Sequence, residues 1–277
     1  MNKQRKPQKM KTIILTLLIS CISLYAEIKL PALFSDGMVL QRDIQVPVWG
    51  WAEKGTKVEV SFAGQTKQTT TPESGKWMLK LDKLSVNAKP ASMTIKVGNE
   101  SKEIKDILVG EVWLCSGQSN MDFTLLQLSK ATREPQYQPI ADYITKEMNT
   151  ASDSLLRQIS VPRLVSPDKP QENFVATWKA SNPENNKIFT GTGYFFARKL
   201  RQELKVPVGL IKAPWGGTLV EPWIPAEAFK STDNEAIQSF IKSNIAAYKA
   251  RAESMTKQRS EQILKSSWLN GKRKQLN

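Results

Sequence analysis

Ser119 is the residue of this sequence best placed to do chemistry. It lies in residues 115–121 (CSGQSNM), directly after the nearly continuous apolar run of residues 107–115. Such a run is typical of a strand buried on both faces of a parallel sheet, and open α/β sheets place reactive groups at the carboxyl ends of such strands. The turn that follows can present backbone N–H groups to a developing oxyanion. The pattern therefore indicates a nucleophilic serine, with an ordinary turn without chemistry as the alternative.

Histidine is absent from all 277 residues. A serine nucleophile near neutral pH normally depends on histidine as its general base. Aspartate or lysine could take this role in principle, but no spacing in the sequence points to one. Since removal of a triad member costs on the order of a million-fold in turnover, a serine hydrolase with this composition is expected to be slow.

The N-terminal residues 1–26 resemble an export signal, with five basic residues leading into an apolar run from Ile13 to Leu24. This signal predicts cleavage after Ala26 and export of the protein to the periplasm or the cell exterior. Residues 18–21 (LISC) also resemble a lipobox, which would make Cys21 a lipid-anchored N-terminus. An uncleaved anchor is the third possibility. The apolar run is too short to span a bilayer comfortably.

Charge and cysteine content exclude several classes of function. The net charge is +14, but the signal and the basic residues 248–277 hold most of it, leaving +3 in residues 27–247. Nucleic acid is therefore not an expected partner, and the tail is interpreted as a solvated face, with a surface that binds acidic polymers as the alternative. Outside the signal Cys115 has no partner for a disulfide, and no cysteine pair or histidine suggests a metal site or cofactor.

Period-two alternation dominates residues 27–106 and predicts a small β-sandwich. The expected strands cover residues 46–51, a stretch with Val58, Val60 and Phe62, the edge strand 66–71, a stretch with Trp77, Leu79 and Leu81, and one with Met93, Ile95 and Val97.

From residue 107 to 247 strand and helix patterns alternate, which predicts an α/β domain with a parallel sheet. The expected strands are residues 107–115, 159–161 and 208–212, with a helix over residues 193–204 and an inserted loop with a short helix over residues 129–154. Beyond Pro225 the chain is expected to be helical, with apolar positions at Ile237, Phe240, Ile241, Ile245 and Tyr248, and residues 248–277 form a basic helical tail. Three parallel strands are few, so the domain is expected to be incomplete.

Four sequence blocks resemble the sialate O-acetylesterases, a branch of the SGNH hydrolases. They are residues 33–42 (LFSDGMVLQR), 46–52 (VPVWGWA), 110–121 (GEVWLCSGQSNM) and 209–218 (GLIKAPWGGT), the last followed by 221–223 (EPW). The resemblance implies a β-domain followed by an SGNH-type α/β domain. It also implies hydrolysis of O-acetyl esters of sialic acid or other glycans.

Site residues follow from this resemblance position by position. Ser119 matches the nucleophile, Gly216 and Gly217 match a turn whose N–H groups approach the oxyanion, and Gln118 and Asn120 would brace the turn or the substrate. The tryptophans at 113, 215 and 223 could stack on a sugar ring or belong to the core.

Two features of the family have no match in this sequence. A later Gln-Gly-Glu block and a C-terminal Asp/His pair are both missing. The chain is therefore expected to be a C-terminally truncated esterase with impaired catalysis, which a separate C-terminal segment could complement. The alternative is a carbohydrate-binding or scaffold remnant without turnover.

Overall fold

The structure is a computed structural model. It describes residues 28–130, 134–164, 166, 169–220, 223–224, 228, 233–240, 242–247, 249–251 and 253–254. The expected signal, the lipid anchor at Cys21 and most of the basic tail lie outside these residues.

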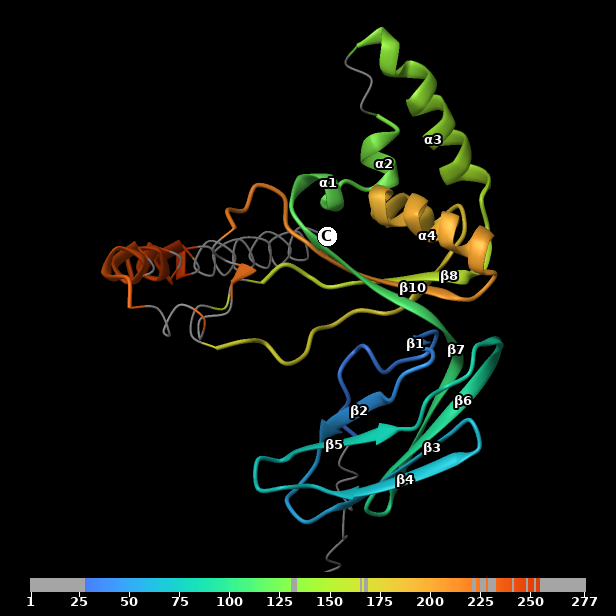
Figure 1. Cartoon of the computed structure of the whole chain (residues 1–277), viewed down its shortest axis with the longest axis vertical. Helices are drawn as coiled ribbons and strands as arrows, with labels where there is room; N and C mark the ends of the chain where they lie inside the picture. Colours follow the sequence, from blue (N-terminus) through green and yellow to red (C-terminus); the bar gives the residue numbers. More distant parts are fainter. Residues whose placement is uncertain are drawn as a thin grey trace, which may run out of the picture.

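The first unit is a β-sandwich (Figure 1). One sheet pairs β2 (Val46–Trp51) with β5 (Lys76–Leu81), and the other contains β4 (Gln65–Thr70), β3 (Lys57–Phe62), β6 (Asn87–Val97) and β7 (Glu100–Gly117). Val58, Val60 and Phe62 are buried in one core with Val48 and Trp77 of the opposite sheet. The alternation predicted from the sequence is confirmed, because side chains of one parity fill the space between the sheets.

Strand β7 is longer than predicted and runs through both units of the fold (Figure 1). Residues 100–109 pair with β6 in a hairpin, residues 108–110 also pair in parallel with β1 (Val39–Gln41), and residues 111–117 belong to the α/β layer. At Asp106 the backbone is left-handed, with φ of 56°. The buried Arg157 donates to the carbonyl oxygen of Asp106 at 2.5 Å and to its carboxylate at 2.8 Å.

The second unit extends the same sheet into a mixed α/β layer, as predicted. Strand β10 (Val208–Pro214) lies between β7 and β8 (Asp153–Ser160) and is parallel to both, and β9 (Lys179–Ser181) closes the edge antiparallel to β8. The helical elements are α1 (Ser119–Asp122), α2 (Leu125–Leu128), η1 (Pro135–Tyr137), α3 (Gln138–Thr150), η2 (Asn185–Ile188) and α4 (Gly191–Leu204). A core with Phe189, Tyr194 and Leu210 joins helices and sheet.

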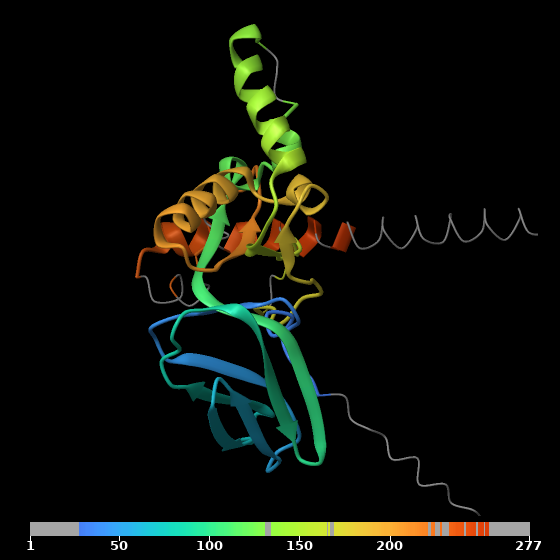
Figure 2. The ribbon, with the colours of Figure 1, turned by 90° about the vertical axis from the view of Figure 1, so that its right-hand side faces the viewer.

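The prediction of a loop with a short helix over residues 129–154 was wrong. Helix α3 has 13 residues and projects away from the sheet (Figure 2), and β8 begins at Asp153. Only Ala141, Ile144 and Met148 of α3 are buried. Their spacing of three and four residues defines one narrow apolar face, which the surrounding polar residues conceal in the sequence.

Helical structure after residue 225 is present in the residues described there. Residues 235–240 and 242–247 are helical, and Ile237, Phe240 and Ile245 are exposed rather than packed in a core. Ile241 and Tyr248 lie outside the described residues. Within the part of the chain that the structure describes, no helix combines the length and the apolar character needed to cross a bilayer.

Candidate active site

Ser119 is the first residue of the one-turn helix α1, two residues beyond the end of β7. Gly117 makes the exit from the strand at φ of 122°, a conformation that favours glycine. The turn is closed by hydrogen bonds from Met121 N–H to Gln118 O at 3.0 Å and from Phe123 N–H to Ser119 O at 3.0 Å. Ser119 is half-buried at the carboxyl end of the strand, as its sequence context predicts.

The hydroxyl of Ser119 has a weak polar environment. Its Oγ donates to Gln118 Oε1 at 3.4 Å, and no carboxylate or amine of the described residues accepts its proton. An amide oxygen is not a base at neutral pH, so this contact does not activate the nucleophile.

Gly216 lies against Ser119, in the turn that follows β10. Trp215 N–H donates to Gly117 O at 2.8 Å and links this turn to the end of β7. A Cβ atom on Gly216 would lie 3.5 Å from Ser119 Oγ and 3.0 Å from Asp122 Oδ2. The N–H of Gly216 donates to Asp122 Oδ2 at 2.8 Å. The backbone donor expected for the oxyanion is therefore next to the nucleophile but occupied by a carboxylate.

Gly217 follows with φ of +78° and is exposed. Gln118 reaches over this turn and donates to the carbonyl oxygen of Thr218 at 3.2 Å. Asn120 is exposed, and its backbone carbonyl oxygen accepts a hydrogen bond from Thr192 Oγ1 at 2.8 Å. Of the sequence-derived residues, the structure thus brings Ser119, Gln118 and Gly216 together.

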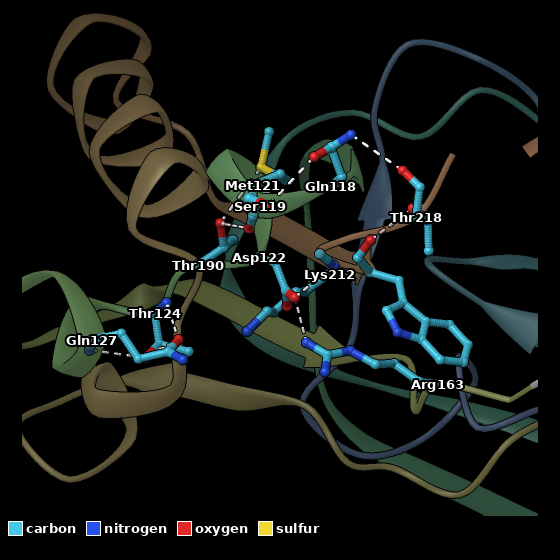
Figure 3. Close-up of polar contacts among 12 residues, drawn as sticks. Gln118, Ser119, Met121, Asp122, Thr124, Gln127, Arg163, Thr190, Lys212 and Thr218 are labelled. Carbon is cyan, nitrogen blue, oxygen red and sulfur yellow. Dashed lines mark hydrogen bonds and ion pairs between the residues drawn. The ribbon is translucent and has the colours of Figure 1, made fainter. Parts of the chain in front are cut away.

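Asp122 and two cations complete the cluster (Figure 3). Arg163, three residues beyond β8, forms an ion pair with Asp122. Burial alone would raise the pKa of Asp122, but the hydrogen bonds from Arg163 and Gly216 and the charges of Arg163 and Lys212 outweigh it, so this pKa lies below its ordinary value. Burial lowers the pKa of Lys212, against the opposing effect of Asp122.

A small pocket of about 80 Å³ opens at this cluster. Its walls are formed by Ser119, Asp122, Phe123, Gln127 and Gly216. A serine hydroxyl, an apolar ring and a backbone turn on one small concavity are features suited to a short acyl group.

Comparison with known proteins agrees with this geometry. No protein-family model matches the chain. It is 32% identical over 216 residues to human sialate O-acetylesterase, an alignment covering 71% of this chain and 39% of that protein, and 30% identical to the rat protein over 70% of this chain and 37% of that protein. The crystal structure of a carbohydrate acetylesterase from Xanthomonas citri superimposes with a TM-score of 0.64 and 34% identity, over 76% of this chain and 45% of that one. The chain belongs to the sialate O-acetylesterase family. It spans about two fifths of the length of the sialate O-acetylesterases it matches.

Three polar residues of this candidate site were missed in the sequence analysis. Asp122 lies one helical turn after Ser119, so the i, i+3 spacing could have placed both on one face. Arg163 and Lys212 lie at the carboxyl ends of β8 and β10. The rule that open sheets gather functional groups at that edge could have found them, once the strand bounds were known.

The three tryptophans considered for sugar stacking lie outside the buried core clusters. Trp113 is 44% exposed and packs edge to face against Phe196, with ring centroids 5.0 Å apart. Trp223 is 39% exposed and donates to Thr218 Oγ1 at 2.9 Å, and Trp215 is half-buried. Of the three, Trp223 is joined by its hydrogen bond to the turn that carries Gly216.

The buried thiol of Cys115 is poorly suited to act as an alternative nucleophile. Burial raises the pKa of its thiol to about 11, against a smaller opposing effect of Lys212, so the thiolate is scarce at neutral pH. Among the residues that the structure describes, no group of three or more His, Cys, Asp or Glu side chains is arranged to hold a metal ion.

Proposed function

We propose that this chain is the nucleophile-bearing part of an esterase that removes O-acetyl groups from sialic acid or other glycans. The observation that carries the proposal is the proximity of Ser119 and Gly216, two residues from separate strand ends that line the same small pocket. The relatives, named sialate O-acetylesterase and carbohydrate acetylesterase, support the same chemistry.

The reaction requires a proton acceptor. Ser119 Oγ would attack the acetyl carbonyl, the bond to the sugar oxygen would break, and that oxygen would leave with a proton. Water would then release acetate and restore the hydroxyl. Asp122 is a poor base for the first step, because its lowered pKa and its bonds to Arg163 and Gly216 stabilise the ionised form. We therefore propose that the 277-residue chain alone turns over slowly.

A further part of the proposal is that a segment equivalent to the part of the relatives that this chain does not cover supplies the proton acceptor. Strand β7 offers a place for it. Glu111 N–H donates to Pro207 O and Gly117 O accepts from Trp215 N–H, so the residues of this parity face β10. The backbone groups of Leu114 and Ser116 point to the opposite edge, where no described strand pairs with them. Such an edge is a template for strand addition.

The alternative is a carbohydrate-binding or scaffold protein without turnover. One observation favours it: the N–H of Gly216 is already bonded to Asp122 and the hydroxyl of Ser119 to an amide. In that arrangement the site could hold an acetylated sugar without reacting.

Acetate release tests the proposal. The chain and Ser119→Ala would be compared on O-acetylated sialic acid and on an aryl acetate. We expect a rate slightly above that of Ser119→Ala, because backbone donors can still assist a weak nucleophile. No difference between the two proteins on either ester would favour the non-catalytic alternative. A rapid rate lost in Ser119→Ala would show that a base other than histidine is present.

We also propose where in the cell the protein acts. The basic start, apolar run and Ala26 of the sequence support export to the periplasm or the cell exterior, with lipidation at Cys21 as the alternative. Mass spectrometry of the mature N-terminus distinguishes Glu27 from a lipidated Cys21. An intact Met1 on cytoplasmic protein would contradict both.

A further inference from the structure

The turn that carries Ser119 is too short to hold its own shape. Helix α1 has four residues, and a helix of one turn is unstable in water without contacts to other elements. Its internal hydrogen bonds run from the N–H groups of residues 121–123 to carbonyl oxygens at the start of the turn. The carbonyl groups at the end of such a helix have no partner within it. The shape of the nucleophile turn therefore depends on donors from another part of the chain.

Two threonines at the start of α4 supply such donors. Thr190 Oγ1 donates to the carbonyl oxygen of Met121 at 2.6 Å, a bond that Figure 3 shows. Thr192 Oγ1 donates to the carbonyl oxygen of Asn120 at 2.8 Å. The end of the nucleophile turn is thus held by hydroxyl groups of a helix that lies about 70 residues further along the chain.

Gly191, between these threonines, brings α4 close to the same turn. Its N–H donates to the carbonyl oxygen of Phe123 at 2.8 Å. A Cβ atom at this position would lie 2.2 Å from Cδ1 of Leu128 in α2 and 3.5 Å from the carbonyl oxygen of Phe123. A larger residue would force Leu128 to move, so the close approach of α4 favours glycine.

Thr190 is the most firmly fixed of these donors. Its side chain is fully buried, and its N–H donates at 3.0 Å to Oε1 of Gln158, a buried residue of β8. Its hydroxyl oxygen also accepts from Gly193 N–H at 3.4 Å, as the N-cap of α4. A hydroxyl has a single proton to donate, and that of Thr190 is directed to Met121. Thr190 therefore links the nucleophile turn to both the helix and the sheet.

We propose that Thr190 is a positioning residue that holds Ser119 beside Gly216 by fixing the nucleophile turn at Met121. This inference rests on the proposed function and adds a residue that is not among those lining the pocket. Attack on an ester depends on the placement of the nucleophile, and a displacement of about 1 Å can cost about a hundredfold in rate. Loss of the Thr190 hydroxyl should therefore slow the chemical step more than it weakens the binding of substrate.

Hydrogen exchange followed by mass spectrometry tests whether Thr190 holds the turn. Thr190→Val keeps the shape of the side chain and removes the hydroxyl, whereas Thr190→Ser keeps the hydroxyl. The N–H groups of residues 121–123 are protected by bonds within the turn, so their exchange reports its opening. We expect the peptide covering residues 116–124 to exchange about tenfold faster in Thr190→Val than in the parent. Thr190→Ser should retain most of the protection.

Acetate release from an aryl acetate tests the consequence for the reaction. The rate of each protein would be corrected by that of its Ser119→Ala derivative. We expect the kcat of Thr190→Val to fall about tenfold while KM changes by less than about twofold, and Thr190→Ser to restore most of the kcat. Ser181→Ala is the matched control, since it removes another buried hydroxyl, which donates to Asn186 Oδ1 at 2.8 Å. It should lower stability but leave kcat and the exchange of the nucleophile turn unchanged.

The positioning role would be overturned by unchanged exchange in Thr190→Val, by an unchanged kcat, or by equal losses in Ser181→Ala. A parent that releases no more acetate than Ser119→Ala would overturn the esterase proposal instead, and the exchange comparison would still decide whether Thr190 holds the turn. If Thr190→Val does not fold, Thr192→Val tests the same contact at an exposed residue. It should give smaller changes in the same direction, and no change in either measurement would refute the contact.

Discussion

Asp122 and Gly216 are 94 residues apart in the chain and are joined by a hydrogen bond of 2.8 Å from Gly216 N–H to Asp122 Oδ2. The bond connects the turn after β7, which carries the nucleophile, with the turn after β10. Arg163, in the segment after β8, forms an ion pair with the same carboxylate. The segments that follow the three parallel strands β7, β8 and β10 therefore all interact with Asp122 or carry it.

Replacement of Asp122 should change the acid stability of the chain. Its pKa is lower in the folded protein than the ordinary value near 3.8, so its contribution is complete above about pH 4 and is lost as pH falls through the folded pKa. At pH 6 the free energy of unfolding of Asp122→Asn should therefore be about 1–3 kcal/mol lower than that of the parent, and its melting temperature lower as well. This difference should narrow towards pH 2. Thermal melts across this range measure it. Asp82→Asn, on an exposed ion pair, is the control and should differ little from the parent. A constant offset of Asp122→Asn at every pH would contradict the assignment.

Arg157 should stabilise the junction between the β-sandwich and the α/β layer. Its side chain is 5% exposed and holds both the carbonyl and the carboxylate of Asp106, where β7 passes from the sandwich to the α/β layer. Arg157→Met would remove the charge-assisted hydrogen bonds from the buried guanidinium to the carbonyl and the exposed carboxylate of Asp106, and we expect a loss of about 1–3 kcal/mol in urea unfolding. The matched change Lys76→Met removes an exposed ion pair with Glu172 and should cost less than about 1 kcal/mol. Equal losses for the two variants would show that Arg157 is not the connecting residue.

Sequence reasoning recovered the features that depend on local pattern. The alternation at Val58, Val60 and Phe62 and the apolar run before Ser119 define strand faces directly, and both are found as expected. The position of β10 between β7 and β8 does not follow from local pattern. The same succession of strands and helices along the chain is compatible with several strand orders in the sheet. The contacts of Asp122 with Gly216 and Arg163 depend on that order, so they could not be predicted before the sheet was known.

The two glycines after β10 should respond differently to alanine. A Cβ on Gly216 would lie 3.0 Å from Asp122 Oδ2, whereas a Cβ on Gly217 has open space but a backbone at φ of +78°. Both variants should lose stability, by about 1–2 kcal/mol, the first by crowding and the second by backbone strain. Double-mutant cycles with Asp122→Ala, which removes the crowded oxygen, separate the causes. Coupling is expected for Gly216→Ala and simple additivity for Gly217→Ala, and additivity in both cases would refute the contact.

Leu114 should control self-association of the isolated chain. Its side chain is 65% exposed, beside the edge of β7 that no described strand covers. The preceding residue, Trp113, is also exposed and packs against the exposed Phe196 of α4. Open strand edges with apolar neighbours pair readily with other chains, and lysine at such an edge opposes this pairing. Leu114→Lys should therefore lower the average mass in light scattering at high protein concentration. Its melting temperature should stay near that of the parent, because an exposed side chain leaves no cavity. Met78→Lys changes a residue that is 51% exposed on β5 of the sandwich and should leave association unchanged. If both lysine variants reduce association equally, the added charge is the cause and the β7 edge is not the contact. If neither does, the edge is not open to other chains, and the place proposed for a complementing polypeptide is wrong.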